Sequence, residues 1–404
     1  MTPWTHALTL ALFATATAHA FSRRQMQIPK GLPFPCAHAD HFRSKERPQS
    51  VHQLMPGDID VVAAIGDSLT AGVGALAEDV YSVILVENRG MSWSIGGQGT
   101  WREYLTLPNI LKQFNRNLTG FSVGDGHSES RSSRFNVAVN GAMDQDVEFA
   151  AATLVRRMHA DHSIDFQNDW KMINVWVGTN DICSDFCYDA NQGPTQHYLN
   201  LQKTLDYLHQ HVPRAFVNLV SAPFIPAYAQ MRGDEPSTCL TMLPFMCSCL
   251  FGGNHAEKLK NVTKATRYFQ LAEEALVESG RYDTRPDFTV QFQPTFKHLS
   301  FPTMRDAATN AEVTDYSYLA FDCFHYSQKF HAVGKQHSKN FYKIHGVVCV
   351  MQRECTLTVS AANAFWNNLL EAPGQKKSSL GAVFEHFECP TKRRPFLATH
   401  LNMS

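Results

Sequence analysis

The chain has 404 residues, and its composition is 44% hydrophobic and 18% charged. This length allows one large domain or two ordinary ones, and this composition excludes a largely disordered chain. Lys and Arg total 36 and Asp and Glu total 37, so the formal net charge is −1. No overall electric field favours nucleic acid, and we expect no nucleic-acid partner. A chain of this charge can still contact lipid through local apolar surface, so peripheral membrane contact is compatible with it.

The N-terminus is typical of a secretory signal peptide. An apolar stretch of small residues at 8–17 is followed by Ala18-His19-Ala20, a cleavage site of the small-x-small type. Because no Lys or Arg precedes this stretch, a buried N-terminal helix is the alternative interpretation. Three N-glycosylation sequons agree with export, and they begin at Asn117, Asn261 and Asn402. We therefore predict that residues 1–20 are a signal peptide and that the mature protein is secreted, extracellular and glycosylated.

The 10 cysteines indicate an oxidising compartment and disulfide bonds. Cys183 and Cys187 are close enough to staple one loop, and three more cysteines crowd residues 239–249. The others are scattered, so their spacing leaves the pairing open. The sequence contains no CxxC pair and no HExxH motif, and we expect no metal. Beyond the signal peptide no apolar run reaches about 18 residues, so we expect no transmembrane span.

The strand and helix patterns begin after an extended N-terminal segment, residues 21–56, which is rich in Pro, His and basic residues. Residues 60–65 form an apolar run that ends in Gly66, which is typical of a buried parallel strand. Four further strands are predicted at 135–139, 171–177, 215–220 and 288–292. Amphipathic spacing predicts helices at 144–158, 195–211 and 262–279. This alternation predicts an α/β fold with a central parallel sheet and helices on both faces.

Ser68 follows the first strand, in the tetrapeptide Gly66-Asp67-Ser68-Leu69, at the predicted start of a helix. Ligands of an open parallel sheet bind beyond the carboxyl ends of its strands. The Ser68 N–H would also point out of a helix N-terminus, where negative charge is stabilised. A serine here can alternatively be a simple helix N-cap. The tetrapeptide in this strand-to-helix context favours a nucleophile.

Gly141 and Asn180 follow two other predicted strands. Gly141 ends the run 136–141, and a glycine N–H can approach a substrate closely. Asn180 lies in Gly178-Thr179-Asn180-Asp181, directly beyond the strand at 171–177, and its amide can donate to an oxyanion. Either residue alone could belong to an ordinary strand-ending turn. Together with Ser68, they predict three groups at one edge of the sheet.

A carboxylate and an imidazole occur late in the chain, in Asp322-Cys323-Phe324-His325. A three-residue spacing at a loop-to-helix turn can bring the carboxylate of Asp322 to Nδ1 of His325. That contact fixes the tautomer and leaves Nε2 free to accept a serine proton. We therefore predict that Asp322 and His325 serve Ser68.

The order of these motifs carries a family resemblance. Gly-Asp-Ser-Leu, the strand-ending glycine, Gly-x-Asn-Asp and Asp-x-x-His resemble the SGNH (GDSL) hydrolases. Longer stretches resemble the animal phospholipase B group more narrowly, and they lie at 51–72, 89–97, 106–111 and 365–371. The resemblance implies a flavodoxin-like three-layer sandwich. It also implies a carboxylic ester hydrolase, without a cofactor and independent of calcium, that cleaves acyl esters of phospholipids, lysophospholipids or related lipids.

The resemblance also assigns roles in an acyl-enzyme mechanism. Ser68 is the nucleophile, His325 is the base and then the acid, and Asp322 orients His325. The oxyanion is held by the N–H groups of Ser68 and Gly141 and by the side chain of Asn180. Gly96 and Gly97 are alternatives to Gly141, because their loop is also characteristic of the group.

The resemblance covers roughly residues 36–375, and we place the hydrolase domain at 57–375, with a C-terminal tail at 376–404. Residues 333–359 depart from the pattern and are predicted to be an atypical insertion. A surface loop of this length costs little chain entropy, but an insertion could also unseat the final helix. Two alternative functions stay open. One is a short-chain or carbohydrate O-acetyl esterase, because the strands and the triad do not separate these substrates, and the other is a catalytically silent lipid-binding variant that the insertion disables.

Overall fold

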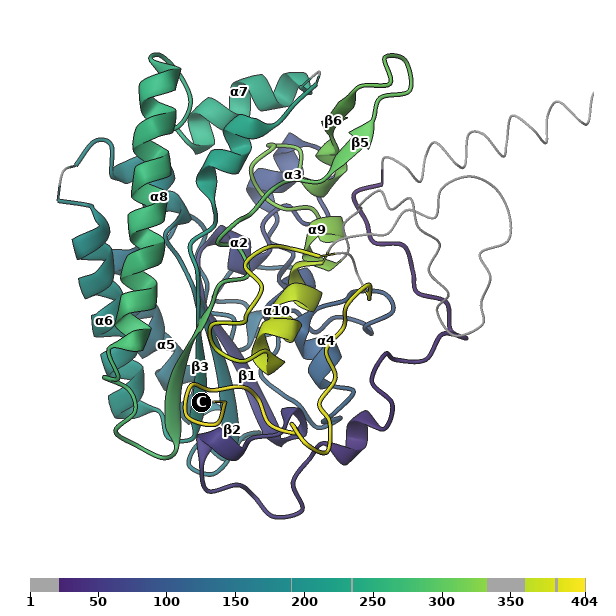
Figure 1. The fold of residues 1–404 in the computed structure, drawn as a ribbon, viewed down its shortest axis with the longest axis vertical. Helices are drawn as coiled ribbons and strands as arrows, with labels where there is room; N and C mark the ends of the chain where they lie inside the picture. Colours follow the sequence, from purple (N-terminus) through teal and green to yellow (C-terminus); the bar gives the residue numbers. More distant parts are fainter. Residues whose placement is uncertain (1–21, 190, 234, 333–359, 382–383, 404) are drawn as a thin grey trace, which may run out of the picture.

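The structure is a computed structural model, and it describes residues 22–189, 191–233, 235–332, 360–381 and 384–403. The predicted signal peptide at 1–20 and the predicted insertion at 333–359 lie outside the described residues. Figure 1 shows a central sheet with helices on either side of it. The predicted α/β fold is confirmed.

Four parallel strands form the sheet in the order β1-β2-β3-β4. Their bounds are β1 (Ile59–Gly66), β2 (Trp170–Trp176), β3 (Ala215–Val220) and β4 (Phe288–Gln293). Every residue of β2 and β3 is buried, as expected for strands that are covered on both faces. The four predictions for these strands agree with the structure to within one residue at each end.

The predicted strand at 135–139 is instead a single parallel bridge, which joins Asn136 to Ala64 on the edge of β1 that faces away from β2. A further backbone bond reaches Gly66 O at 3.0 Å, so the segment follows β1 to its end. The outer carbonyls of the segment bind the buried guanidinium of Arg89 where another strand would be needed to continue the sheet. The prediction of a regular strand is therefore wrong in extent.

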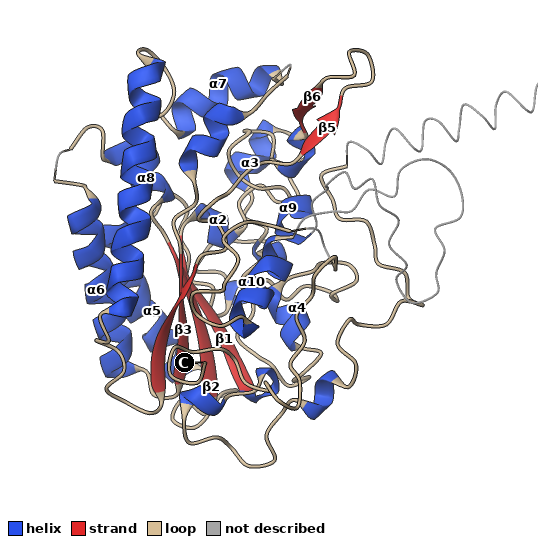
Figure 2. Ribbon diagram, in the orientation of Figure 1, coloured by secondary structure: helices blue, strands red, loops and turns tan. Residues whose placement is uncertain are grey.

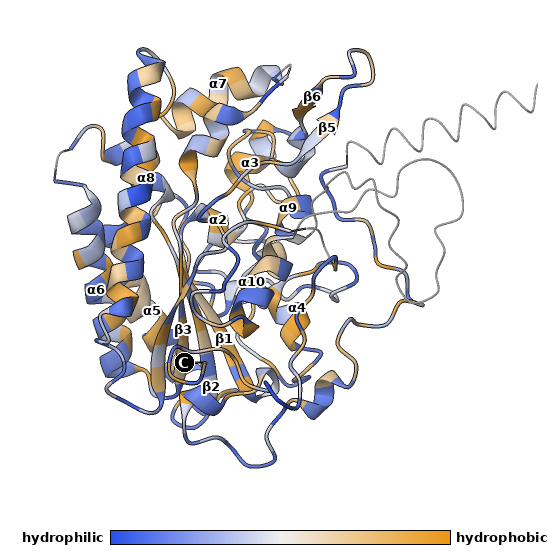
Figure 3. Cartoon of the chain, viewed as in Figure 1, coloured by the Kyte–Doolittle hydropathy of each residue, from blue (hydrophilic) through white to orange (hydrophobic). Residues whose placement is uncertain are grey.

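One face of the sheet is covered by α5 (Val147–Ala160), α6 (Pro194–His211) and α8 (His255–Glu278). They correspond to the three predicted helices, and a 3-10 turn at Asp144–Asp146 precedes α5. Figure 3 shows hydrophobic strands and amphipathic helices around them. The burial of one apolar side per helix against the sheet explains this layer (Figure 2).

The opposite face is covered by α4 (Leu107–Leu111) and α10 (Ala361–Leu370), and every residue of α10 is buried. The remaining α-helices and strands of the described residues are α2 (Ser68–Ala71), α3 (Val80–Leu85), α7 (Ser237–Met246), α9 (Gln328–Ala332) and a hairpin of β5 (Thr303–Arg305) and β6 (Glu312–Thr314). Within the described ranges, no helix has both the length and the apolar character needed to cross a bilayer.

Four disulfides connect distant parts of the described chain. The bonds are Cys36–Cys389, Cys183–Cys247, Cys187–Cys249 and Cys239–Cys323. Instead of stapling one loop, Cys183 and Cys187 each pair with a cysteine of the 247–249 turn. Cys323 lies inside the Asp-x-x-His motif, so its disulfide ties that motif to α7.

The Gly-Asp-Ser-Leu motif has a steric requirement for its glycine. A Cβ on Gly66 would lie 2.4 Å from both Thr70 Oγ1 and Trp176 O. We therefore expect Gly66→Ala to destabilise the fold by about 1–3 kcal/mol or more. Urea unfolding of both proteins measures this loss. Gly253→Ala is the matched control, because no heavy atom lies within 4 Å of its added Cβ. Equal stability of the two variants would contradict the steric account.

Candidate active site

Ser68 opens α2, two residues beyond the end of β1. Asp67 is the helix N-cap, because its side chain accepts a hydrogen bond from Leu69 N–H at 2.9 Å. The alternative interpretation of Ser68 as the N-cap is therefore wrong. Ser68 is 2% exposed, and neither its N–H nor its hydroxyl donates to another described residue. Both groups are left free to act on a bound molecule.

His325 is held by the carboxylate that the sequence predicts. Its Nδ1 lies 2.5 Å from Asp322 Oδ2, and the other Asp322 oxygen accepts the N–H groups of Phe324 and His325 at 3.1 and 3.0 Å. Burial would raise the pKa of Asp322, but the charge and hydrogen bonds of His325 and these N–H groups hold that pKa below its usual range. Asp322 is therefore ionised at neutral pH. Nε2 of His325 is buried and without a hydrogen-bond partner among the described residues.

The segments that carry Ser68 and His325 pack together. A small apolar cluster joins residues that follow Ser68, one that precedes Gly141 and one that precedes Asp322: Ala71, Val73, Ala77, Val83, Ala138 and Ala320. Beyond His325, Gln328 N–H donates to Ala75 O at 2.7 Å. The described residues include no hydrogen bond between the Ser68 hydroxyl and Nε2 of His325. Catalytic hydrogen bonds are often long without substrate and tighten when it binds.

Gly141 and Asn180 meet above the end of β1. Nδ2 of Asn180 donates to Ala142 O at 2.9 Å, which leaves its second hydrogen for another acceptor. Gly141 is exposed, and its φ of +78° suits a residue without a side chain. Its N–H has no acceptor among the described residues. The chain thus offers two adjacent, unused donors from two different loops.

The two alternative glycines do not offer free donors. Gly96 N–H donates to Ser92 O at 2.8 Å, and Gly97 N–H donates to Ser122 O at 2.8 Å. Either N–H would have to break a backbone hydrogen bond before it could hold an oxyanion. Gly141 is therefore the better candidate of the three.

The part that Arg89 plays was not predicted from the sequence. Its guanidinium is 1% exposed, pairs with Glu87 at 2.5 Å, and donates to the carbonyls of Asn136 and Ala138 at 3.0 and 2.8 Å. These bonds fix the segment that leads into Gly141. Arg89 lies in the stretch 89–97, which indicated a family resemblance but no role for the arginine itself.

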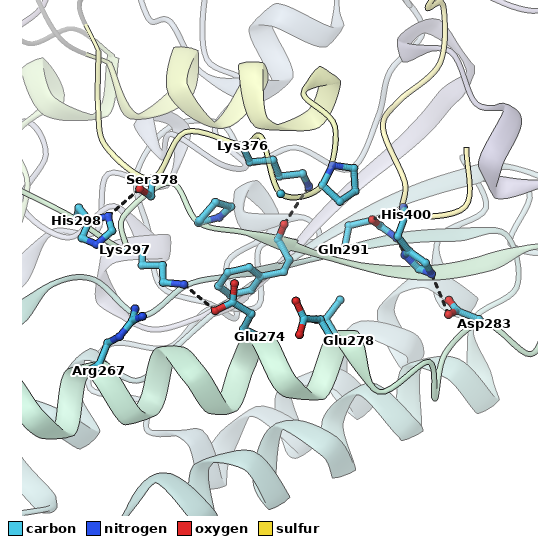
Figure 4. Close-up of a pocket in the computed structure, with 15 residues that line it drawn as sticks. Arg267, Glu274, Glu278, Asp283, Gln291, Lys297, His298, Lys376, Ser378 and His400 are labelled. Carbon is cyan, nitrogen blue, oxygen red and sulfur yellow. Dashed lines mark hydrogen bonds and ion pairs between the residues drawn. The ribbon is translucent and has the colours of Figure 1, made fainter. Parts of the chain in front are cut away.

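A separate cleft lies between α8, β4 and the chain after α10, with a cavity volume of about 490 Å³ (Figure 4). It contains another serine–histidine pair, since Ser378 Oγ lies 2.7 Å from Nδ1 of His298. His298 is exposed, and no carboxylate orients its ring within the part of the chain that the structure describes. Its N–H also bonds Ser378 O at 2.9 Å, so the pair fastens two segments together. None of the candidate site residues lines this cleft.

One group of described side chains has ligand atoms close enough together to hold a metal ion: Glu371, His386 and Glu388. These side chains already bond one another and their neighbours, with His386 Nε2 at 2.8 Å from Glu388 and Asn368 donating to Glu371 at 3.0 Å. The group contains none of the candidate site residues. We therefore assign it no part in the chemistry.

A parallel α/β sheet that carries a free serine hydroxyl, an oriented histidine and free amide donors beyond its strand ends has the architecture of a carboxylic ester hydrolase. Residues 62–333 match the family described as GDSL-like Lipase/Acylhydrolase, and the chain belongs to that family. The predicted family and enzyme class are confirmed.

The chain is also similar to longer mammalian proteins. "Phospholipase B1, membrane-associated" of Mus musculus is 37% identical over 383 residues, which are 94% of this chain and 24% of the mouse protein. The protein of the same name from Homo sapiens is 37% identical over 404 residues, which are 97% of this chain and 25% of the human protein. The chain therefore spans about a quarter of the length of these relatives. The predicted resemblance to the animal phospholipase B group is confirmed.

Asp67 gives the site a pH-dependent stability. Burial raises the pKa of this carboxyl to about 6, although the Leu69 N–H and His325 act in the opposite direction. Its pKa in the unfolded chain is about 3.9. The folded state therefore resists ionisation, and stability is lost as pH rises from about 4 to about 6.

We expect Asp67→Asn to relieve this loss, because Asn is an equally good N-cap and never ionises. The gain in unfolding free energy should be small at pH 4 and reach about 3 kcal/mol above pH 6. Urea unfolding of the wild type and the variant at pH 4 and pH 7.5 measures the difference. A gain or loss that is the same at both pH values would contradict this account, because it would show that folding does not shift the pKa of Asp67.

Proposed function

We propose that this chain is a secreted serine hydrolase that cleaves acyl esters of phospholipids, lysophospholipids or related lipids through an acyl-enzyme. One observation carries the proposal, the arrangement of His325 beside Ser68. Asp322 Oδ2 lies 2.5 Å from Nδ1 of His325 and orients the ring. Nε2 of His325 is buried without a hydrogen-bond partner among the described residues, beside the segment that presents the free Ser68 hydroxyl. The names of the mammalian relatives support a phospholipid or lysophospholipid as the substrate.

In the proposed reaction, His325 Nε2 takes the proton of the Ser68 hydroxyl, and the serine oxygen attacks the ester carbonyl. The negative charge that develops on the carbonyl oxygen is stabilised by three donors: Ser68 N–H, Gly141 N–H and Asn180 Nδ2. His325 then donates its proton to the departing alcohol. Water repeats the sequence on the acyl-enzyme and releases the fatty acid.

Secretion is proposed from the N-terminal sequence, the disulfides and the sequons. The side chains of Asn117 and Asn261 are exposed, whereas the amide of Asn402 is already bound to His52 O at 2.8 Å and Leu397 O at 3.0 Å. We expect glycans at the first two positions. In protein secreted from animal cells, Asn117→Gln and Asn261→Gln should each lower the intact mass by one glycan, and Asn402→Gln should not. Unchanged masses for all three variants would contradict secretion through the glycosylating pathway.

Ser68→Ala tests the nucleophile directly. We expect the wild type to react with a fluorophosphonate probe and to hydrolyse palmitoyl lysophosphatidylcholine, and Ser68→Ala to do neither. Asn180→Ala should remain folded and lose about 10²–10³-fold in kcat, as removal of one oxyanion donor typically does. Ser378→Ala is the matched control, because it removes the other serine–histidine pair and should leave turnover unchanged.

The outcomes of this experiment separate the alternatives. Retained hydrolysis by Ser68→Ala would overturn the assignment of the nucleophile. Turnover of an acetyl ester with none of the palmitoyl ester would favour a short-chain or carbohydrate O-acetyl esterase. A wild-type chain that binds lipid but neither reacts with the probe nor hydrolyses an ester would favour the silent lipid-binding variant.

A further inference from the structure

A buried network of four titratable side chains lies directly behind the oxyanion donors. It consists of Asp144, Asp181, His197 and Glu273, and each is at most 3% exposed. These residues come from four separate places in the chain: the turn before α5, the loop after β2, helix α6 and helix α8. We call them the acid–histidine network. The reaction described above uses none of them.

His197 is the centre of this network. Its Nδ1 lies 2.9 Å from Asp144 Oδ2, and its Nε2 lies 3.3 Å from Glu273 Oε1. Both oxygens of Glu273 also accept the N–H of Ala222 at 3.0 Å, just beyond the end of β3. Carboxylates only accept hydrogen bonds, so the ring uses both nitrogens as donors and carries a positive charge. His197 therefore binds α6 to α8 and to a strand end.

The network reaches the two loops that carry the oxyanion donors. Asp144 N–H donates to Asp181 Oδ1 at 3.0 Å, which joins the loop after Gly141 to the loop of Asn180. The ring of His197 packs against the same loop, since a Cβ on Gly178 would lie 3.3 Å from its Cε1. The position of Gly141 relative to Asn180 thus depends on groups that lie outside the reacting site.

The charges of the network fit this arrangement. Burial would lower the pKa of His197, but its bonds and ion pairs with Asp144 and Glu273 raise it to about 10. Burial and the charge of Asp144 raise the pKa of Asp181, and its Oδ2 has no hydrogen-bond partner among the described residues. A neutral Asp181 beside an ionised Asp144 avoids two adjacent buried charges of the same sign. The network therefore keeps its geometry at neutral pH.

We propose that His197, Asp144 and Glu273 are positioning residues that hold Gly141 and Asn180 where they can stabilise the oxyanion. This inference rests on the proposed ester hydrolysis. An oxyanion donor acts on the transition state more than on the bound substrate, so its displacement lowers kcat and leaves KM nearly unchanged. A displacement of about 1 Å can cost about 100-fold in rate.

The experiment compares His197→Gln and Glu273→Gln with the wild type, in hydrolysis of a soluble p-nitrophenyl ester. We expect each variant to lose about 10- to 100-fold in kcat, with KM changed by less than about threefold. Asp206→Asn is the matched control, because it removes a half-buried carboxylate of α6 that lies outside the network and pairs with Arg281 at 2.6 Å. Its turnover should stay at the wild-type level.

The same changes made in Asn180→Ala separate positioning from a general structural role. If the network acts through Asn180, His197→Gln should lower kcat by a clearly smaller factor in this background than in the wild type. An equal cost in both backgrounds would overturn the proposal. Glu273→Gln provides the same comparison if His197→Gln does not fold, because Gln keeps an acceptor for Ala222 N–H.

Failure of the proposed hydrolysis and failure of the positioning role give different results. A wild-type chain that hydrolyses no ester would overturn the proposed function and the positioning role together. An active wild type with folded network variants of equal kcat would overturn the positioning role alone. A large rise in KM without a fall in kcat would also overturn it, because that result would mean that the network shapes substrate binding instead.

Discussion

The parallel pairing of β1 at Gly66 is the constraint on which the site depends. Gly66 is paired with Trp176 of β2 on one side and accepts a backbone bond from the 135–139 segment on the other. Three adjacent segments therefore end at the same level, and the next residues of each carry Ser68, Asn180 or Gly141. Gly66 has no room for a side chain, because Thr70 of α2 and Trp176 of β2 pack directly against it. This close packing sets the turn from β1 into α2.

The histidine comes from a different part of the chain and needs its own restraints. Asp322 accepts three hydrogen bonds within its own turn, and the Cys239–Cys323 disulfide ties that turn to α7. Buried polar groups restrain the loop of Gly141 in a similar way. Arg89 satisfies the carbonyls before Gly141, and His197 joins the carboxylates behind it. Each charge in these two groups therefore has an opposite charge or a backbone partner, as burial in a low-dielectric interior demands.

The sequence predicted the local features well, because they depend on residues that lie close together in the chain. Apolar runs placed β1 to β4 within one residue, and motif spacing located Ser68 and the Asp322–His325 pair. It did not predict contacts that depend on folding, such as Arg89 with a segment 47 residues away or His197 with Glu273, 76 residues away. The disulfide pairing was open for the same reason. Helix α7 was not predicted from the sequence, because it is apolar on most sides and has Pro244 inside it, so it lacks an amphipathic period.

We propose that the strand ends present one nucleophile and three donors to the same oxyanion. A crystal structure of the chain after reaction with a fluorophosphonate tests it most directly. We expect phosphorus bonded to Ser68 Oγ, with the phosphoryl oxygen about 2.7–3.1 Å from Ser68 N, Gly141 N and Asn180 Nδ2. A phosphoryl oxygen directed toward Gly96 or Gly97, or an adduct on any other serine, would contradict it.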